Sequence, residues 1–271
     1  MLRLSRSGAT GEATHAERAF LGVSALLFAS AAALTIAWCA SMAAMGGMPM
    51  PGGWTMSMAW MRMPGQTWPG AAASFLGMWV VMMVAMMLPS LLPMLSRYRS
   101  AVAPTVGASP GRLTVLAGAA YHMVWAAVGL AVYPLGVALA AAEMRQPALA
   151  RAVPIMAAIV VIAAGALQFS TWKAHHLNCC RALPARGTAS TTGAGAWRHG
   201  LRLGFHCVAG CANLTAILLV VGVMDLRAMA VVTAAITVER LAPNGERIAR
   251  VVGAVIVVAG LFLVARAAGL G

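Results

Sequence analysis

The amino-acid sequence predicts an all-α fold, a polytopic helix bundle in a membrane. Of the 271 residues, 61% are hydrophobic and only 9% are charged, and the mean hydropathy is +0.84. Soluble globular domains usually carry about 25% charged residues. A helix needs roughly 20 apolar residues to cross the hydrocarbon core, and several stretches of the chain meet that requirement. Together these observations place the chain among multi-spanning membrane proteins.

About seven transmembrane helices are predicted, with loops between them and no separate soluble domain. The predicted spans are Phe20–Ala43, Ala72–Leu95, Leu113–Ala141, Ala152–Trp172, Leu203–Val223, Leu226–Val238 and Ile248–Ala267. The first span is expected to be retained, because it is too long for a signal peptide and lacks a small-residue cleavage site. The sixth is short for a full crossing. Tails over residues 1–19 and 268–271 flank a single transmembrane domain over residues 20–267.

The net charge of +13 would favour a nucleic-acid partner in a soluble protein. Here, however, the basic residues lie in short loops beside apolar spans, a pattern that the positive-inside rule explains. Every second loop is rich in basic residues, beginning with the tail before the first span. The N-terminus is therefore predicted to be cytoplasmic and the C-terminus outside. The predicted location is a bacterial inner membrane, with the lipid bilayer and not a nucleic acid as partner.

A methionine-rich segment follows the first span, within the expected outer loop at residues 43–70. Residues 42–63 contain eight methionines, and six of these form M-x-M pairs. The six are Met48, Met50, Met56, Met58, Met61 and Met63. A thioether is neutral and soft, so it prefers Cu(I). The loop is predicted to collect copper, although methionine also serves as adaptable apolar filler at an interface.

The second span carries a methionine stripe. Met78, Met82 and Met86 recur every four residues, so their sulfur atoms share one helical face. The stripe is expected either to form a ladder of weak copper sites or simply to pack against neighbouring helices, and the spacing leaves both interpretations open. Pro89 and Pro93 each remove a backbone hydrogen bond, so a kink is predicted near the inner end.

A cluster of thiols and imidazoles is expected where the fourth span meets a cytoplasmic loop at residues 173–202. The cluster contains His175, His176, Cys179 and Cys180. On a continued helix His176 shares a face with Cys180, as His175 does with Cys179. Thiolate and imidazole suit Cu(I), with Zn(II) as a possible second metal. Inert or acylated juxtamembrane cysteines are the alternative.

Cys207 and Cys211, four residues apart, point the same way early in the fifth span. Because the fourth and fifth spans are antiparallel neighbours, His176, Cys180, Cys207 and Cys211 are predicted to meet at the cytoplasmic surface. A reducing cytoplasm keeps such thiols free for metal. Free cysteine also packs well as a small hydrophobic residue, which is the alternative here.

Three other polar contacts are expected. Gln168 is predicted to hydrogen bond across a helix interface. Tyr121 and His122 are interpreted as a polar contact between helices, and Glu239 with Arg240 as an ion pair at a helix end.

Three stretches carry a family resemblance: MWVVMMVAMMLPS, QFSTWKAHHLNCCR and GLRLGFHCVAGCANLTAILLVVGVMDLRAMAVVTAAITVERLAPNG. They resemble bacterial integral membrane proteins predicted to bind metal, a family that includes the membrane copper chaperone accompanying a bacterial tyrosinase. The resemblance covers much of the chain from Met78 to Gly260. His176 stands where that family usually has a cysteine, Cys180 keeps its cysteine position, and Cys207 and Cys211 match the later cysteines. The resemblance implies copper handling, with delivery to a copper enzyme.

The sequence thus predicts a non-enzymatic membrane protein that binds Cu(I) for transport, or for delivery to a copper enzyme or a soluble copper carrier. The chain contains no nucleotide-binding motif and no nucleophile with a base and an orienting acid. Two alternatives stay open. One is an assembly or interaction subunit in which the sulfur atoms only pack. The other is a membrane redox protein that uses Cys179 and Cys180, or a haem bound by histidines.

Overall fold

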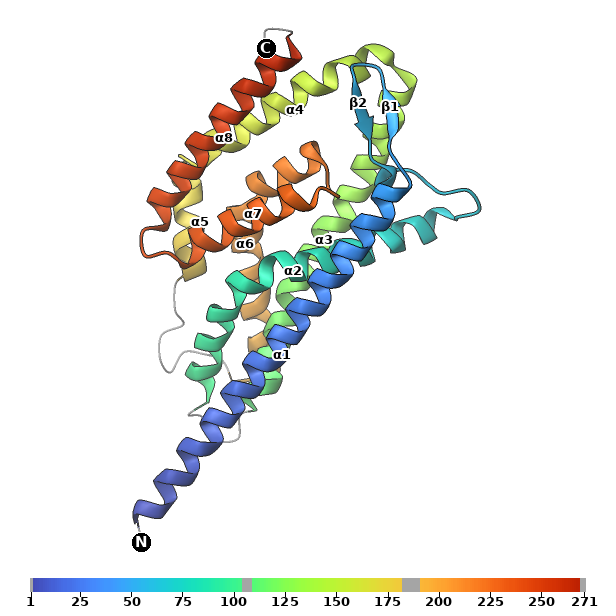
Figure 1. Cartoon of the computed structure of the whole chain (residues 1–271). Coiled ribbons are helices and arrows are strands. Elements are labelled where there is room, and N and C mark those ends of the chain that lie inside the picture. Colours follow the sequence, from blue (N-terminus) through green and yellow to red (C-terminus); the bar gives the residue numbers. More distant parts are fainter. Residues whose placement is uncertain (1, 104–108, 182–190, 269–271) are drawn as a thin grey trace.

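A computed structural model describes residues 2–103, 109–181 and 191–268, with side chains from residue 15 onward. Within these ranges the fold is helical apart from one short hairpin (Figure 1). The helices are α1 (Leu2–Ala44), α2 (Trp68–Val102), α3 (Pro110–Arg145), α4 (Pro147–Leu167), α5 (Thr171–Arg181), α6 (Gly193–Val221), α7 (Leu226–Leu241) and α8 (Gly245–Ala267). The hairpin strands are β1 (Met48–Met50) and β2 (Trp54–Met56), and a 3-10 turn, η1 (Met58–Trp60), follows them.

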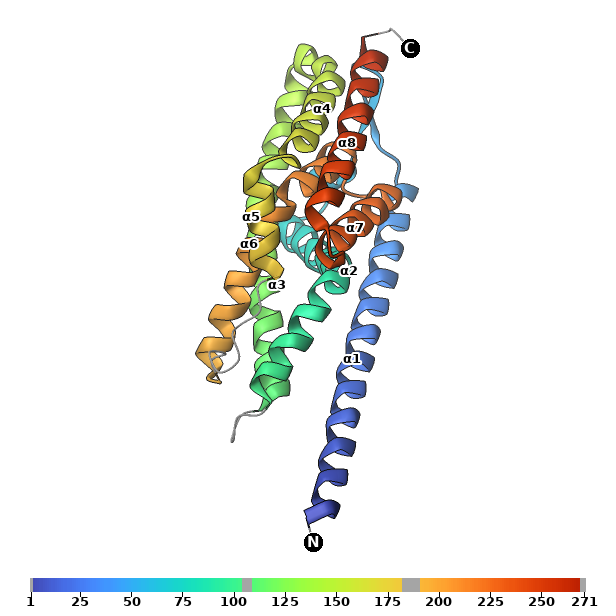
Figure 2. The ribbon, with the colours of Figure 1, turned by 90° about the vertical axis from the view of Figure 1, so that its left-hand side faces the viewer.

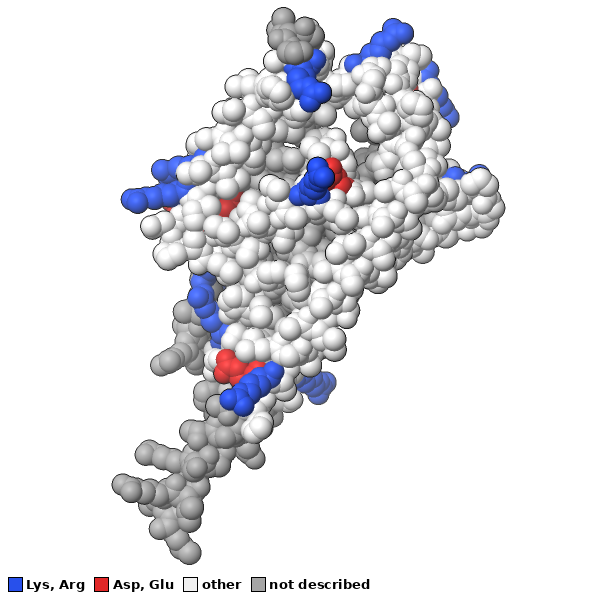
Figure 3. Space-filling model, viewed as in Figure 1, with Lys and Arg blue, Asp and Glu red and all other residues white. Residues whose placement is uncertain are grey.

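Six of the described helices are long and apolar enough to cross a membrane: α1, α2, α3, α4, α6 and α8. Their outer faces are apolar, as Leu26, Val115 and Val258 illustrate with exposed fractions of 69%, 70% and 67%. Figure 3 shows a mostly white surface on which charged side chains form small, separate groups. Such a large exposed apolar surface needs lipid around it. The all-α, polytopic membrane fold predicted from the sequence is confirmed.

The predicted count of seven spans differs from the structure at α7. This helix has 16 residues and is not among the six long apolar helices. It contacts α2, α5, α6 and α8 and lies at mid-height in the molecule, while the two termini lie at opposite ends (Figure 1). Figure 2 shows α1 along one side and α4, α5 and α6 along the other. The short α7 therefore brings its polar C-terminal end into the interior.

Local signals explain where the central helices begin and end. Thr192 caps α6, because its side chain accepts a hydrogen bond from the amide of Gly195. Gly222, with φ of 142°, ends α6 in a conformation that other residues rarely adopt. Asp225 then caps α7 through the amides of residues 227 and 228. Ser170 accepts a hydrogen bond from the amide of Lys173, so α5 begins anew after the break that ends α4.

Two helix pairs pack closely because glycines face neighbouring backbone. In α6, a side chain at Gly200 or Gly204 would overlap α3 at Ala117 or Val124. In the α4–α8 pair, Gly165 lies against the backbone of Gly253. Small residues at such crossings let membrane helices approach each other. The α3–α6 contact matters for function, because α6 carries two cysteines.

Two expected loops contain regular structure. The outer loop at residues 43–70 includes the β1–β2 hairpin, in which Met48 pairs with Met56. The loop at residues 173–202 is shorter than predicted, because α5 continues to Arg181 and α6 begins at Gly193. The interval from 182 to 190 lies outside the described residues. The tail expected over residues 1–19 is mostly helix, since α1 begins at Leu2. Figure 1 also shows α2, which contains Pro89 and Pro93, bending along its length.

Candidate metal centre

Three cysteines from two helices gather in the interior. Cys180 lies on α5, and Cys207 and Cys211 lie on α6; their exposed fractions are 4%, 0% and 3%. All three are free thiols. The break between α4 and α5 lets α5 lie against α6, so Cys180 reaches the same interior region as the α6 pair. This region is the thiol cluster.

A guanidinium group connects the members of the thiol cluster. Arg240, at the end of α7, donates a hydrogen bond from Nη2 to Cys180 Sγ at 3.0 Å. Its Nη1 donates to Ser90 Oγ at 3.0 Å and to the Tyr121 hydroxyl at 3.5 Å. The Tyr121 hydroxyl lies 2.8 Å from Cys207 Sγ. Because this hydroxyl accepts from Arg240, its own hydrogen is free to point at Cys207.

Cys207 and Cys211 form a pair within the cluster. They are one helical turn apart on α6, so their side chains lie on the same face of the helix. Across residues 15–103, 109–181 and 191–268, no three side chains of His, Cys, Asp or Glu meet closely enough to hold one ion. The arrangement therefore offers two such ligands at one point. Thiolate pairs suit a soft ion such as Cu(I).

Cys180 differs from the pair on α6. Burial raises the pKa of its thiol, and the nearby Arg240 charge opposes that rise. Its sulfur atom accepts a hydrogen bond from the Arg240 guanidinium, so this thiol lies next to the positive charge of Arg240.

His176 does not join the thiol cluster, in contrast to the prediction. Its Nδ1 lies 3.1 Å from Nδ1 of His206, and its ring packs on Trp172. Partial burial, together with His206 and His175, lowers the pKa of His176. The predicted set of four ligands is therefore separated: α5 is rotated so that Cys180 faces α7, while His176 faces another side of α6.

His175 and Cys179 form a separate pair near the surface, with His175 Nε2 3.5 Å from Cys179 Sγ. They share a face of α5, as their spacing of four predicts. This pair is accessible to solvent and lies one residue from the buried Cys180.

The expected ion pair between Glu239 and Arg240 is not formed. Glu239 instead pairs with Lys173, with Nζ 2.7 Å from Oε2, and it accepts a hydrogen bond from Gln168 Nε2 at 2.7 Å. Consecutive residues on a helix point about 100° apart, so Glu239 faces α4 and α5 while Arg240 faces the thiols. The predicted interhelical hydrogen bond of Gln168 is confirmed.

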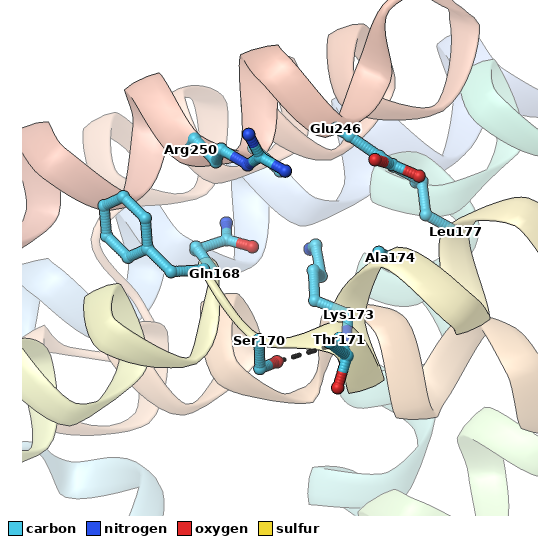
Figure 4. Close-up of a pocket in the computed structure, with 10 residues that line it drawn as sticks. Gln168, Ser170, Thr171, Lys173, Ala174, Leu177, Glu246 and Arg250 are labelled. Atoms are coloured by element: carbon cyan, nitrogen blue, oxygen red, sulfur yellow. Dashed lines mark hydrogen bonds between the residues drawn. The ribbon is translucent and has the colours of Figure 1, made fainter.

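A cavity of about 230 Å³ opens beside this ion pair, between α5 and α8 (Figure 4). Lys173, Glu246 and Arg250 line it together with Gln168, Ser170 and five apolar or hydroxyl residues. Its lining contains no sulfur and no imidazole. The cavity therefore lacks soft-metal ligands, and the thiol cluster is the stronger candidate for a metal centre.

The methionine stripe of α2 is entirely buried, with exposed fractions of 6%, 2% and 3% for Met78, Met82 and Met86. The methionine that reaches the thiols is on the adjacent face: Met87 Sδ lies 4.0 Å from Cys207 Sγ. Thioethers of α2 thus adjoin the thiol cluster directly.

The outer methionines divide into two groups. Met50 and Met56 are buried under the hairpin against Ala140 and Ala150, with Met48 partly buried beside them. The others border a cavity of about 100 Å³, whose sulfur-bearing lining residues are Met42, Met58, Met61, Met63, Met78 and Met224. Met224 also lies 3.9 Å from Cys39 Sγ. We call this the methionine pocket.

Sequence reasoning missed the polar neighbours of the thiols. Tyr121 was expected only to contact another helix, and Arg240 only to pair with Glu239. Ser90 was not singled out. An ionisable residue that ends an apolar helix is a functional candidate by itself, and this signal at Arg240 was available in the sequence.

Residues 76–263, well over half of the chain, match the model of a protein family described as PpoB2, copper chaperone. The matched region includes the thiol cluster and the α2 methionines and leaves out the β1–β2 hairpin. Neither a curated protein nor a solved structure matched the chain. The match supports a copper-related role and confirms the resemblance seen in the sequence: the chain belongs to the PpoB2 family of copper chaperones.

Proposed function

We propose that this protein carries Cu(I) in a bacterial inner membrane and holds it between the thiolates of Cys207 and Cys211. One observation carries the proposal: these two thiols share one face of α6, and Cys207 Sγ lies 4.0 Å from Met87 Sδ and 2.8 Å from the Tyr121 hydroxyl that Arg240 contacts. A soft ligand and a nearby positive charge suit a monovalent soft ion bound by thiolates.

The α2 methionines and the methionine pocket extend the soft surface beyond the thiol cluster. Met78 belongs both to the stripe and to the pocket lining. Thioethers bind Cu(I) without a proton change, so the ion can exchange between them and the thiols without ATP. In this proposal the pocket collects or releases copper and the stripe relays it.

The pair of exposed His175 and half-buried Cys179 is proposed as the point of exchange with a soluble copper carrier or a copper enzyme. A transfer site must be reachable by the partner, and this pair lies near the surface one residue from Cys180. Transport across the membrane and delivery to an enzyme use the same chemistry, ligand exchange between soft donors.

Copper binding by the purified full chain tests the proposal. Cu(I) is titrated anaerobically against a competing chelator, for the wild type and for the Cys207→Ser, Cys211→Ser double variant. The wild type is expected to retain one tightly held Cu(I), and the double variant to lose it. Cys39→Ser, the same change at a buried thiol outside the cluster, should keep it.

Equal copper retention by the double variant and the wild type would remove the thiol pair from the mechanism. A wild type that binds no copper, yet stabilises a partner enzyme, would instead favour the assembly subunit.

A further inference from the structure

Arg240 is a buried cation that pairs with no carboxylate of the described residues. Its exposed fraction is 4%, and within residues 15–103, 109–181 and 191–268 the one ion pair is between Lys173 and Glu239. Both oxygens of the neighbouring carboxylate are already engaged by Lys173 and Gln168. A buried unpaired charge is strongly unfavourable, because low-dielectric surroundings do not replace its hydration.

The groups that surround Arg240 are neutral when the cysteines are protonated. They are the Cys180 thiol, the Ser90 hydroxyl and the Tyr121 hydroxyl. A further buried donor group, the Trp125 indole, belongs to the same core cluster as Cys207. Donors therefore converge on sulfur atoms, and the site is built to surround an anion.

The charge of a metal–thiolate complex depends on the metal. Cu(I) bound by two thiolates carries one net negative charge, whereas Zn(II) bound by the same two thiolates is neutral. The two ligands proposed are Cys207 and Cys211, which share one face of α6, and no group of three His, Cys, Asp or Glu side chains among the described residues is placed to hold an ion. When the charge of Arg240 is included, the copper complex has no net charge, whereas the zinc complex leaves a buried net positive charge.

We propose that Arg240 is the specificity-determining residue of the site, selecting monovalent Cu(I) and Ag(I) over Zn(II) by neutralising the anionic dithiolate complex. This rests on the proposed function and goes beyond it, because copper carriage by itself does not require charge selection. Arg240 touches no metal ion in this account. It acts through its charge, and through the Tyr121 hydroxyl on Cys207.

The test compares metal affinities of the full chain in detergent at one fixed pH. Ag(I) and Zn(II) are the probes, each titrated against a competing chelator, and Ag(I) avoids oxidation during the titration. The variants are Arg240→Gln, which removes the charge, and Arg240→Lys, which keeps it. Arg250→Gln on α8 is the matched control, since that arginine lines the cavity away from the thiols.

Arg240→Gln is expected to lower the ratio of Ag(I) to Zn(II) affinity on the order of 100-fold, as for one charge at about 5 Å and an effective dielectric constant near 20. The loss should lie in Ag(I) affinity, with Zn(II) affinity nearly unchanged. Arg240→Lys and Arg250→Gln should stay within about 10-fold of the wild-type ratio. An unchanged ratio in a folded Arg240→Gln variant overturns the inference.

If Arg240→Gln does not fold, Arg240→Lys tests charge selection in its place. A lysine variant with the wild-type ratio supports charge selection, and one that loses about 100-fold overturns it. The two proposals fail in different ways. If wild-type protein binds neither Ag(I) nor Cu(I), the proposed function is wrong, whereas tight wild-type binding with an unchanged ratio in Arg240→Gln contradicts only the role of Arg240.

Discussion

The Lys173 ammonium lies 2.7 Å from the Glu239 carboxylate, and the two side chains are only 4% and 1% exposed. Lys173 also donates a hydrogen bond to the carbonyl oxygen of Gly210 at 2.7 Å. The contact joins α5, α6 and α7 at one point, next to the thiol cluster. It holds α5 in the rotation that directs Cys180 toward Arg240, and it occupies the carboxylate nearest to Arg240 in the sequence.

Replacing Glu239 by glutamine is expected to lower the free energy of unfolding by about 3–5 kcal/mol, because the Lys173 ammonium then stays buried without a counter-charge. The combination Lys173→Met with Glu239→Leu should restore much of the loss, since no charge is left unpaired. Chemical unfolding in detergent, followed by circular dichroism, measures both. Glu246→Gln is the control, because that carboxylate makes an exposed hydrogen bond to Asn178. Similar losses in Glu239→Gln and the control would contradict the prediction.

Met87→Leu is expected to slow the arrival of Cu(I) at the cysteines, because it removes the sulfur atom 4.0 Å from Cys207 Sγ. Leucine nearly conserves the volume of methionine, so the stability should change by less than about 1.5 kcal/mol. Stopped-flow transfer of Cu(I) from a coloured chelator measures the rate. Met94→Leu, on the same helix and partly buried in the core, should transfer at the wild-type rate. Equal rates in the two variants would mean that Met87 only packs.

Gly200→Ala is expected to destabilise the protein by about 1–3 kcal/mol, because its new methyl group would overlap the Ala117 carbonyl of α3. Gly210→Ala is the matched change on the same helix. There the nearest atom, His176 Cβ, would lie 3.6 Å away, and alanine favours a helix by about 0.5–1 kcal/mol over glycine. Thermal unfolding of both variants should therefore give shifts of opposite sign. Shifts of the unfolding temperature with the same size and sign in both variants would contradict a close α3–α6 contact at Gly200.

The folded protein is expected to become less stable as the pH is lowered, because of His176. Its pKa in the folded protein lies below the ordinary value of 6.5. The unfolded chain therefore binds a proton first as the pH falls, and the folded state loses stability from about pH 6.5 down through the lowered pKa. The thermal midpoint at several pH values from 5 to 8 measures this slope. In His176→Gln the slope should be smaller, and an identical slope in both proteins would exclude the histidine pair as its cause.

Several features of the fold were predictable because they depend on local sequence. Hydrophobicity over about 20 residues identifies a membrane helix without knowledge of its neighbours, and six of the seven predicted spans correspond to long apolar helices. The pairing of Cys207 with Cys211 follows from the helical repeat alone. The break that separates α5 from α4 and the β1–β2 hairpin were not predicted, because no local pattern distinguishes the break from a continuous helix or the hairpin from an irregular loop.

The sequence by itself determined the membrane class of this protein, its methionine-rich segment and the thiol pair on one helical turn, since each depends on residues close together in the chain. Only the tertiary structure decided that Tyr121, Arg240 and Ser90 surround those thiols and that His176 does not. These contacts join residues 60 to 150 positions apart. They depend on the rotation of each helix about its axis, which the packing of glycines and the buried Lys173–Glu239 pair sets, and which no local pattern encodes.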